Sequence, residues 1–153
     1  MIAIELPDEA ATARLAARLA RLARAGDVIA LRGELGAGKT SFARAFIHAR
    51  GGAEDVPSPT FTLVQVYEVG DAAIWHVDAY RLRDPEEAWE LGLDDAFRDG
   101  ISLIEWPERL GALVPARRLE IALSPGDTID ARRVAIDAPG DWAARLASVA
   151  LEA

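Results

Sequence analysis

The fold is decided by the stretch LRGELGAGKTSF, residues 31–42. Within it, Gly33, Gly38, Lys39 and Thr40 satisfy the pattern G-x-x-x-x-G-K-[ST] of phosphate-binding loops, known as Walker A. Glycines let successive backbone N–H groups turn toward phosphate oxygens, and the N-terminus of a following helix adds partial positive charge. The pattern therefore predicts a triphosphate site in which Lys39 reaches the β- and γ-phosphates and the Thr40 hydroxyl binds Mg²⁺.

The surroundings of this loop match its expected context. DVIALRG, residues 27–33, has the composition of a strand buried in a parallel sheet, and KTSFARAFIHAR, residues 39–50, is expected to form a helix that ends at Gly51 and Gly52. A strand, this loop and a helix in succession are the setting in which the pattern binds phosphate. The loop residues expected to contact the nucleotide are Gly33, Glu34, Leu35, Gly36, Ala37, Gly38, Lys39, Thr40 and Ser41.

Strand-like runs elsewhere extend the predicted sheet. TLVQVYEV (62–69) and AAIWHVDAY (72–80) flank a Gly-Asp turn, while RRLEIALS (117–124) and RRVAIDA (132–138) flank Pro-Gly-Asp, so each pair is expected to form an antiparallel hairpin. IAIEL (2–6) alternates as a short edge strand does. The fold class predicted is α/β, with a P-loop NTPase-type sheet of parallel core strands, antiparallel strands at the flanks and helices on both faces.

Composition narrows the class of protein further. The chain has 153 residues and no cysteine, which predicts a single domain over residues 1–153, built around the P-loop and without a disulfide framework. We find no signal peptide and no apolar run of about 20 residues, and we therefore expect a soluble, cytoplasmic protein that does not enter a membrane. A net charge of −8 argues against a broad basic surface, so direct DNA binding is not expected and any link to RNA should run through a partner.

Carboxylates end three apolar runs, and such strand ends are where open α/β sheets bind ligands. Asp78 ends AIWHVD, Glu105 ends ISLIE and Asp137 ends VAID. Asp137 lies in DAPG, which is better read as a turn and helix cap because it falls about a hundred residues after the loop. Asp78 and Glu105 are therefore the expected catalytic acids and metal ligands; one holds Mg²⁺ and the other orients or deprotonates water. His76 alternates with Asp78 and is more simply explained as a packed histidine than as a catalytic one.

Further residues bear on the choice of nucleotide and on its contacts. The chain contains no asparagine, which excludes the guanine-reading element N-K-x-D and favours ATP over GTP. Thr60, in the loop SPTF, is placed to sense the γ-phosphate through Mg²⁺, or simply belongs to a loop stiffened by proline. Trp106 follows Glu105 directly and either joins the core or shields the nucleotide site.

Four blocks, taken in order, resemble one known family. They are GELGAGKTSF (33–42), SPTFTLVQVY (58–67), HVDAYRL (76–82) and LIEWPE (103–108). Together they look like the TsaE (YjeE) family, the P-loop ATPases of bacterial tRNA threonylcarbamoyladenosine biosynthesis. The resemblance implies slow, Mg²⁺-dependent ATP hydrolysis. It also implies two partner proteins, TsaB and TsaD, with which the family serves the modification of adenosine 37 in tRNAs that read codons beginning with A. The resemblance further implies that TsaD carries out the transfer reaction and that the chain contacts tRNA only indirectly, through the partner complex.

The resemblance also assigns roles to single residues. Lys39 and Thr40 become the phosphate and Mg²⁺ residues, Asp78 and Glu105 the acids at the metal and the water. Thr60 falls in the switch-like loop and Trp106 against the nucleotide, and the resemblance adds nucleotide contacts from PDEAAT (7–12) and from a late-strand arginine best matched by Arg133.

Two other functions remain compatible with a P-loop of this size. One is a free-standing small-molecule kinase, although such kinases carry an arginine-bearing lid and no lid segment is evident in the sequence. The other is a scaffold that binds ATP without turnover. Phosphate release, measured alone and with the two partner proteins, separates the three.

Overall fold

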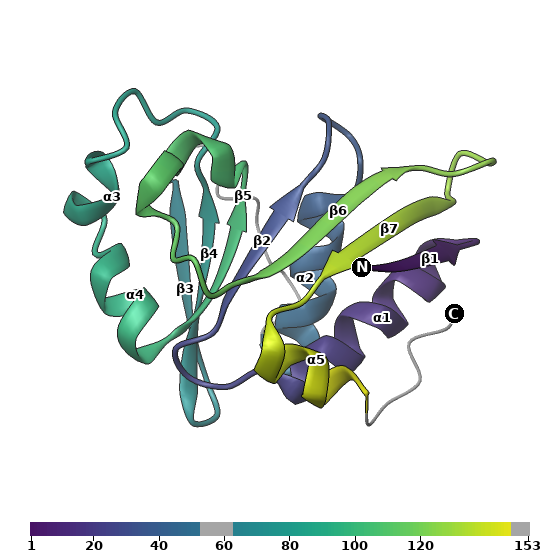
Figure 1. Cartoon of the computed structure of the whole chain (residues 1–153), viewed down its shortest axis with the longest axis horizontal. Helices are drawn as coiled ribbons and strands as arrows, with labels where there is room; N and C mark the ends of the chain where they lie inside the picture. The colour runs from purple at the N-terminus through teal and green to yellow at the C-terminus, as the bar shows by residue number, and fades with distance from the viewer. Residues whose placement is uncertain (53–62, 148–153) are drawn as a thin grey trace.

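In the part of the chain that the computed structural model describes, residues 1–52 and 63–147, a seven-stranded sheet forms the centre of the fold (Figure 1). The strands are β1 (Ile2–Leu6), β2 (Val28–Arg32), β3 (Val64–Val69), β4 (Ala72–Asp78), β5 (Ile101–Glu105), β6 (Leu119–Pro125) and β7 (Arg132–Asp137). The helices are α1 (Glu9–Leu22), α2 (Lys39–Ala49), α3 (Glu87–Glu90), α4 (Leu93–Asp99), the 3₁₀ helix η1 (Pro107–Leu113) and α5 (Gly140–Leu146).

The strands lie in the order β1-β7-β6-β2-β5-β4-β3. β6, β2, β5 and β4 are parallel to their neighbours within this group, whereas β3 pairs antiparallel with β4, and β7 pairs antiparallel with both β6 and β1. The predicted parallel core with antiparallel flanks is confirmed, as are both hairpins and the short edge strand. The strand before the phosphate-binding loop, β2, therefore lies near the middle of the sheet.

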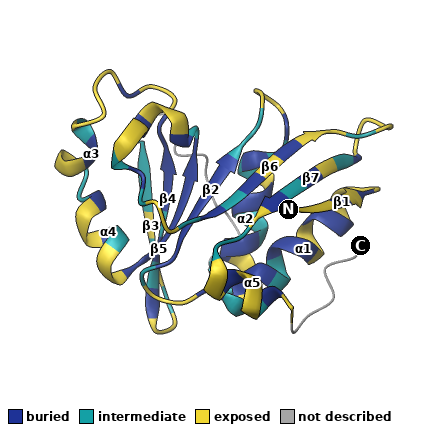
Figure 2. Cartoon of the chain, viewed as in Figure 1, coloured by how far each residue is buried: buried dark blue, intermediate teal, exposed yellow. Residues whose placement is uncertain are grey.

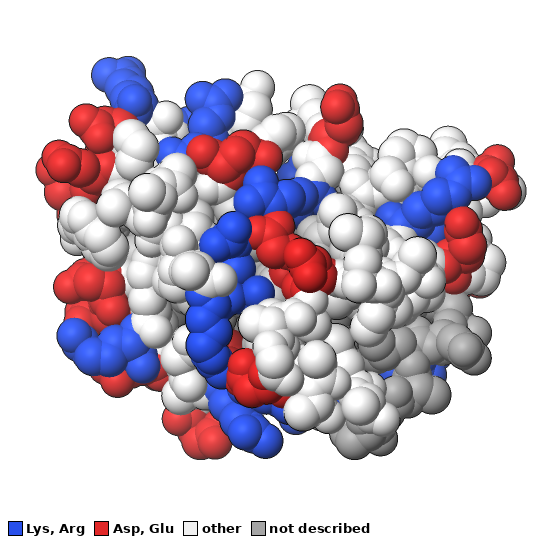
Figure 3. Space-filling model, in the orientation of Figure 1, with Lys and Arg blue, Asp and Glu red and all other residues white. Residues whose placement is uncertain are grey.

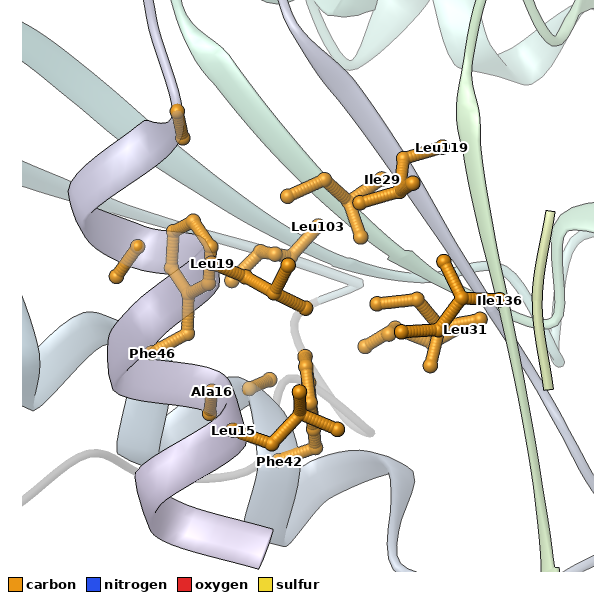
Figure 4. Packing of buried hydrophobic residues seen from close by; sticks show 14 of the residues in the cluster. Leu15, Ala16, Leu19, Ile29, Leu31, Phe42, Phe46, Leu103, Leu119 and Ile136 are labelled. Carbon is orange, nitrogen blue, oxygen red and sulfur yellow. The ribbon is translucent and has the colours of Figure 1, made fainter. Parts of the chain in front are cut away.

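Alternating side chains of the sheet feed two apolar layers. Ile29 and Leu31 of β2 enter one layer with α1 and α2, while Val28 enters the other with α4 and η1. Figure 4 shows the first layer from close by. There Phe42 and Phe46 of α2 lie against the sheet strands beside α1. Each such large side chain contributes about 1.5–3 kcal/mol on burial. Figure 2 shows the resulting pattern, with a buried sheet interior and exposed outer helix faces.

Charged side chains on the face shown in Figure 3 are mixed in sign. Lys and Arg gather in a band down the middle of this face, and acidic side chains border the band. Ion pairs on the protein surface include Arg32 with Glu108 and with Glu120. This mixing agrees with the net charge of −8 and provides no broad basic field for a nucleic-acid backbone on this face. In the described ranges, none of the helices has the length and apolar character that crossing a membrane requires.

A buried ion pair ties the C-terminal helix to the sheet. Asp27, at the start of β2, accepts hydrogen bonds from Arg145 Nη1 at 2.6 Å and Nη2 at 3.1 Å, and from the backbone N–H of Arg24 at 2.6 Å. Arg145 also donates to the carbonyl of Leu22 at 3.0 Å. Both charged side chains are almost fully buried. The end of α1, the start of β2 and α5 are thus joined through one carboxylate.

We predict that Asp27→Ala lowers the free energy of unfolding by about 3 kcal/mol, because it removes the buried partner of the buried Arg145 guanidinium, although Arg145 keeps its ion pair with the more exposed Asp141. Urea denaturation followed by circular dichroism measures this loss. Asp95→Ala is the matched control, since Asp95 forms an exposed pair with Arg98 and should change stability far less. Equal losses in the two variants would contradict the structural role of Asp27.

Candidate functional site

The candidate site lies where the carboxyl ends of β2, β5 and β4 meet. Leu31 pairs with Glu105 across β2 and β5, and Glu105 pairs with Asp78 across β5 and β4. The two acids are consequently side by side, one strand and two strands away from the strand that leads into the loop. The sequence placed both acids at strand ends, and the register brings them together at the edge where parallel sheets bind ligands.

The loop after β2 is shaped by glycine. Gly36 and Gly38 have φ values of 82° and 105°, which side chains rarely adopt. Gly33 leaves no room for a side chain, because a Cβ there would lie 2.6 Å from the carbonyl oxygen of Leu123. α2 begins immediately after Gly38, and no side chain in the described part of the chain caps its N-terminus. The first-turn N–H groups of an uncapped helix are suited to an anion.

Lys39 is buried at this loop and held by oxygen atoms. Its Nζ donates to the carbonyls of Gly33 and Glu34, the second at 2.9 Å, and lies 4.0 Å from the ring centre of Trp106. Burial lowers the pKa of Lys39, although Glu105 and other nearby carboxylates oppose that effect. A bound phosphate would favour the charged ammonium further, so the residue fits an anionic ligand.

Thr40, Glu105 and His76 form a continuous hydrogen-bonded group. Thr40 Oγ1 donates to the Glu105 carboxylate, at 2.9 Å from Oε1 and 3.1 Å from Oε2, and His76 Nε2 lies 2.7 Å from Oε2. His76 and Glu105 are both buried. The sequence linked Thr40 and Glu105 to the same ion but gave no sign of the His76 contact, which depends on the pairing of β4 with β5.

Aromatic side chains form the rim of the site beside Asp78. Asp78 Oδ1 accepts a hydrogen bond from the backbone N–H of Tyr80 at 3.0 Å, and the Tyr80 ring lies 4.9 Å from that of Trp106. Trp106 itself has φ 61°, a left-handed conformation that turns the chain directly after Glu105. Its ring lies against Lys39 and also packs against the second apolar layer, so both alternatives expected for Trp106 have a contact in the structure.

The late-strand arginine at the loop is Arg132, and the expectation for Arg133 is corrected. Arg132 Nε donates to the carbonyl of Ala37 at 2.9 Å, while Arg133 points away and pairs with Glu5 and Asp127. The alternation of RRVAID contained the signal, since Val134 is buried and Arg132 shares its side of the strand. Block matching to a family cannot choose between adjacent arginines, whereas the strand period can.

Two of the cavities that adjoin the loop share Gly38, Ser41 and Arg132. The first, of about 230 Å³, is the cleft over the loop. Its lining residues are Leu35, Gly36, Gly38, Lys39, Thr40, Ser41, Asp78, Glu105, Trp106 and Arg132. The second, of about 300 Å³, lies between α1, α2 and the β6–β7 turn. It is lined by Glu9, Thr12, Ala13, Gly38, Ser41, Arg44, Ala45, His48, Asp130 and Arg132.

The donor set at the cleft fits a nucleotide-bound Mg²⁺. Thr40, Asp78 and Glu105 offer only oxygen atoms, which Mg²⁺ prefers. Within residues 1–52 and 63–147, no group of three or more His, Cys, Asp or Glu side chains forms a metal cage. Mg²⁺ in phosphate-transferring sites uses one or two carboxylates, phosphates and water, and needs no such cage.

Other residues expected at the site are placed as follows. Gly33 and Glu34 direct their carbonyls to Lys39, Leu35 is exposed at the loop tip, and Ala37 is buried beneath it. Thr60 lies outside the described residues. The stretch PDEAAT contributes Glu9 and Thr12 to the wall of the second cavity.

Fold and site together define a P-loop protein of the α/β class, with a mixed sheet and an acid pair beside the loop. The family model described as "Threonylcarbamoyl adenosine biosynthesis protein TsaE" matches residues 6–134. The chain therefore belongs to the TsaE family of tRNA threonylcarbamoyladenosine biosynthesis proteins.

Individual relatives agree with this assignment. The chain is 41% identical to TsaE of Rickettsia felis over 119 residues, which cover 77% of this chain and 70% of that protein. It is 39% identical to TsaE of Bacillus subtilis over 137 residues, covering 88% and 83% respectively. The crystal structure of YdiB from Bacillus subtilis superimposes with a TM-score of 0.80 at 31% identity, covering 96% of this chain and 92% of that one. The predicted fold class and family are confirmed.

We predict that the Lys39 ammonium titrates below the usual pH range of lysine and that ATP with Mg²⁺ raises its pKa, because burial disfavours the charge and a bound anion favours it. Lys39 is the only lysine in the chain, so protein labelled with ¹³C,¹⁵N-lysine gives one side-chain signal to follow by NMR. A midpoint at or above that of free lysine would refute the buried placement.

Proposed function

We propose that this chain binds ATP with Mg²⁺ at the loop and hydrolyses it, and that hydrolysis supports a partner complex of TsaB and TsaD. That complex would place threonylcarbamoyl on adenosine 37 of tRNAs reading codons that begin with A. The observation that carries the proposal is the group formed by Thr40, Glu105 and Asp78 beside Lys39, at the end of a phosphate-binding loop.

The side chains of the cleft suit hydrolysis of a triphosphate. Lys39 and the uncapped start of α2 would bind the phosphates, and Thr40 with Glu105 would hold Mg²⁺. The ion supplies charge neutralisation on the phosphate oxygens. Asp78, in the next strand, lines the same cleft and would orient water there. Trp106 covers Lys39 and limits its contact with solvent.

The second cavity is the proposed place of the adenosine. Ser41 and Ala45 of α2 line this cavity. It shares Gly38 with the phosphate cleft. Glu9, Thr12 and Arg44 provide polar groups on its wall, which suits the amine and ring nitrogens of a purine. Arg132 borders both cavities and would lie near the phosphate closest to the ribose.

Partner dependence is supported by charge and by family membership. The chain carries a net charge of −8, and the tRNA would therefore be held by other proteins. The relatives from Rickettsia felis and Bacillus subtilis carry the name tRNA threonylcarbamoyladenosine biosynthesis protein.

Phosphate release by the purified chain, alone and with TsaB and TsaD, tests the proposal. We expect slow release alone and faster release with both partners. A phosphorylated product from a panel of small acceptors would instead establish a kinase. Binding without any turnover, with or without the partners, would establish a scaffold.

We predict that Glu105→Gln nearly abolishes hydrolysis but leaves ATP affinity within about tenfold, or about 1.4 kcal/mol, because the phosphates are held mainly by the loop. Single-turnover phosphate release and binding of a fluorescent ATP analogue give the two quantities. Glu68→Gln, an exposed change in β3, serves as control. Unchanged phosphate release in Glu105→Gln would show that Glu105 takes no part in hydrolysis.

Adjacent arginines provide a second, matched test. Arg132→Ala should weaken ATP binding about tenfold or more, because a cation and the Ala37 tether are lost at the junction of the two cavities. Arg133→Ala removes the same type of side chain one residue away, where it faces Glu5, and should leave affinity unchanged. Isothermal titration calorimetry with a non-hydrolysable analogue compares them. A larger loss of affinity in Arg133→Ala than in Arg132→Ala would show that Arg133, and not Arg132, contacts the nucleotide.

A further inference from the structure

We propose that His76 is a positioning residue that holds the Glu105 carboxylate in place through a hydrogen bond from Nε2. The inference rests on the proposed ATPase function and adds a residue to it. His76 lies in the middle of β4, paired with Gln65 of β3 and Leu103 of β5, and its side chain is fully buried. The sheet thus sets the position of the imidazole.

Glu105 is held at both of its oxygens. Oε1 is nearest to the Thr40 hydroxyl at 2.9 Å, and Oε2 is 2.7 Å from His76 Nε2. An ionised carboxylate only accepts hydrogen bonds, so Nε2 carries the proton in this contact. In the described part of the chain, Thr40 and His76 are the side chains that donate to this carboxylate.

The contacts of Glu105 with Thr40 and with His76 differ in their relation to the proposed nucleotide site. The Thr40 oxygen is the one proposed to bind Mg²⁺ through a lone pair while its proton stays with Glu105, so the Thr40 hydroxyl would be shared between the ion and the carboxylate. His76 has no part in the cleft lining, and its bond to Oε2 can persist. His76 therefore preserves the orientation of Glu105 while Thr40 serves the ion, as outer residues do for metal-ligating groups.

The surroundings of the His76 imidazole favour a role in positioning Glu105 over a role in proton transfer. His76 Nδ1 is buried and has no hydrogen-bond partner among the described residues. A histidine that relays protons in a catalytic triad is oriented by an acid at its second nitrogen, and no described residue plays that part here. The contribution assigned to His76 is one donated hydrogen bond.

The tautomer is the first test, and it needs neither nucleotide nor turnover. The chain contains two histidines, so a long-range ¹H–¹⁵N NMR spectrum resolves both rings. We expect His76 with the proton on Nε2 in the wild type, and a changed signal in Glu105→Ala. A proton on Nδ1 alone, or a signal indifferent to Glu105→Ala, would overturn the proposal.

Kinetics of two replacements supply the second test. His76→Leu keeps the buried volume and loses the donor, so kcat with both partners should fall about 10–100-fold while affinity for a non-hydrolysable ATP analogue stays within about threefold. His76→Gln retains an amide N–H near the position of Nε2 and should regain most of the loss. A purely structural role would predict equal damage from both changes, together with weakened nucleotide binding.

Ser102→Ala is the matched control. Ser102 is a fully buried polar residue of β5, its hydroxyl has no hydrogen-bond partner among the described residues, and it is not one of the residues that line the cleft. Its removal should leave kcat unchanged. Wild-type protein that releases no phosphate with its partners would overturn the proposed ATPase function. Wild-type turnover matched by His76→Leu would overturn the role of His76 alone.

Discussion

The register of β2, β5 and β4 is the constraint on which the site depends. Leu31, Glu105 and Asp78 lie opposite one another at the carboxyl ends of these strands. Because successive side chains alternate between faces, a slip of one residue would send Glu105 to the opposite layer and bury Ile104 at the cleft. The fully buried interior of β5 resists such a slip. Hydrophobic packing therefore fixes the position of the two acids proposed to act in hydrolysis.

The cleft is preorganised by contacts within the chain. Lys39 is held by the carbonyls of Gly33 and Glu34 and by the ring of Trp106, and Glu105 is held by Thr40 and His76. Groups of both charges are thus already desolvated and oriented, which reduces the reorganisation required when charge develops on a bound phosphate. In the proposed site, phosphate would replace the carbonyl contacts of Lys39 and add a further anion to the carboxylates already near it.

Local patterns in the sequence predicted the loop, the hairpins, the parallel core and the acids at strand ends, because each depends on residues close together in the chain. The contact between His76 and Glu105 spans 29 positions and follows from strand order, which no local pattern encodes. The alternation of buried and exposed residues in β7 would have predicted that Arg132 faces the loop. The family resemblance instead pointed to its neighbour Arg133. The expectation for Thr60 remains a prediction, since its loop lies outside the described residues.

The two acids have different environments, and this difference argues for different roles. Glu105 occupies the strand next to β2 and contacts Thr40, the position at which P-loop proteins place the acid that accompanies Mg²⁺. Asp78 lies one strand further out, and the backbone N–H of Tyr80 fixes one of its oxygens. When neighbouring carboxylates differ in this way, the environment divides the work between them. In the proposed reaction Glu105 thus belongs with the ion, and Asp78 is the better candidate to orient the attacking water.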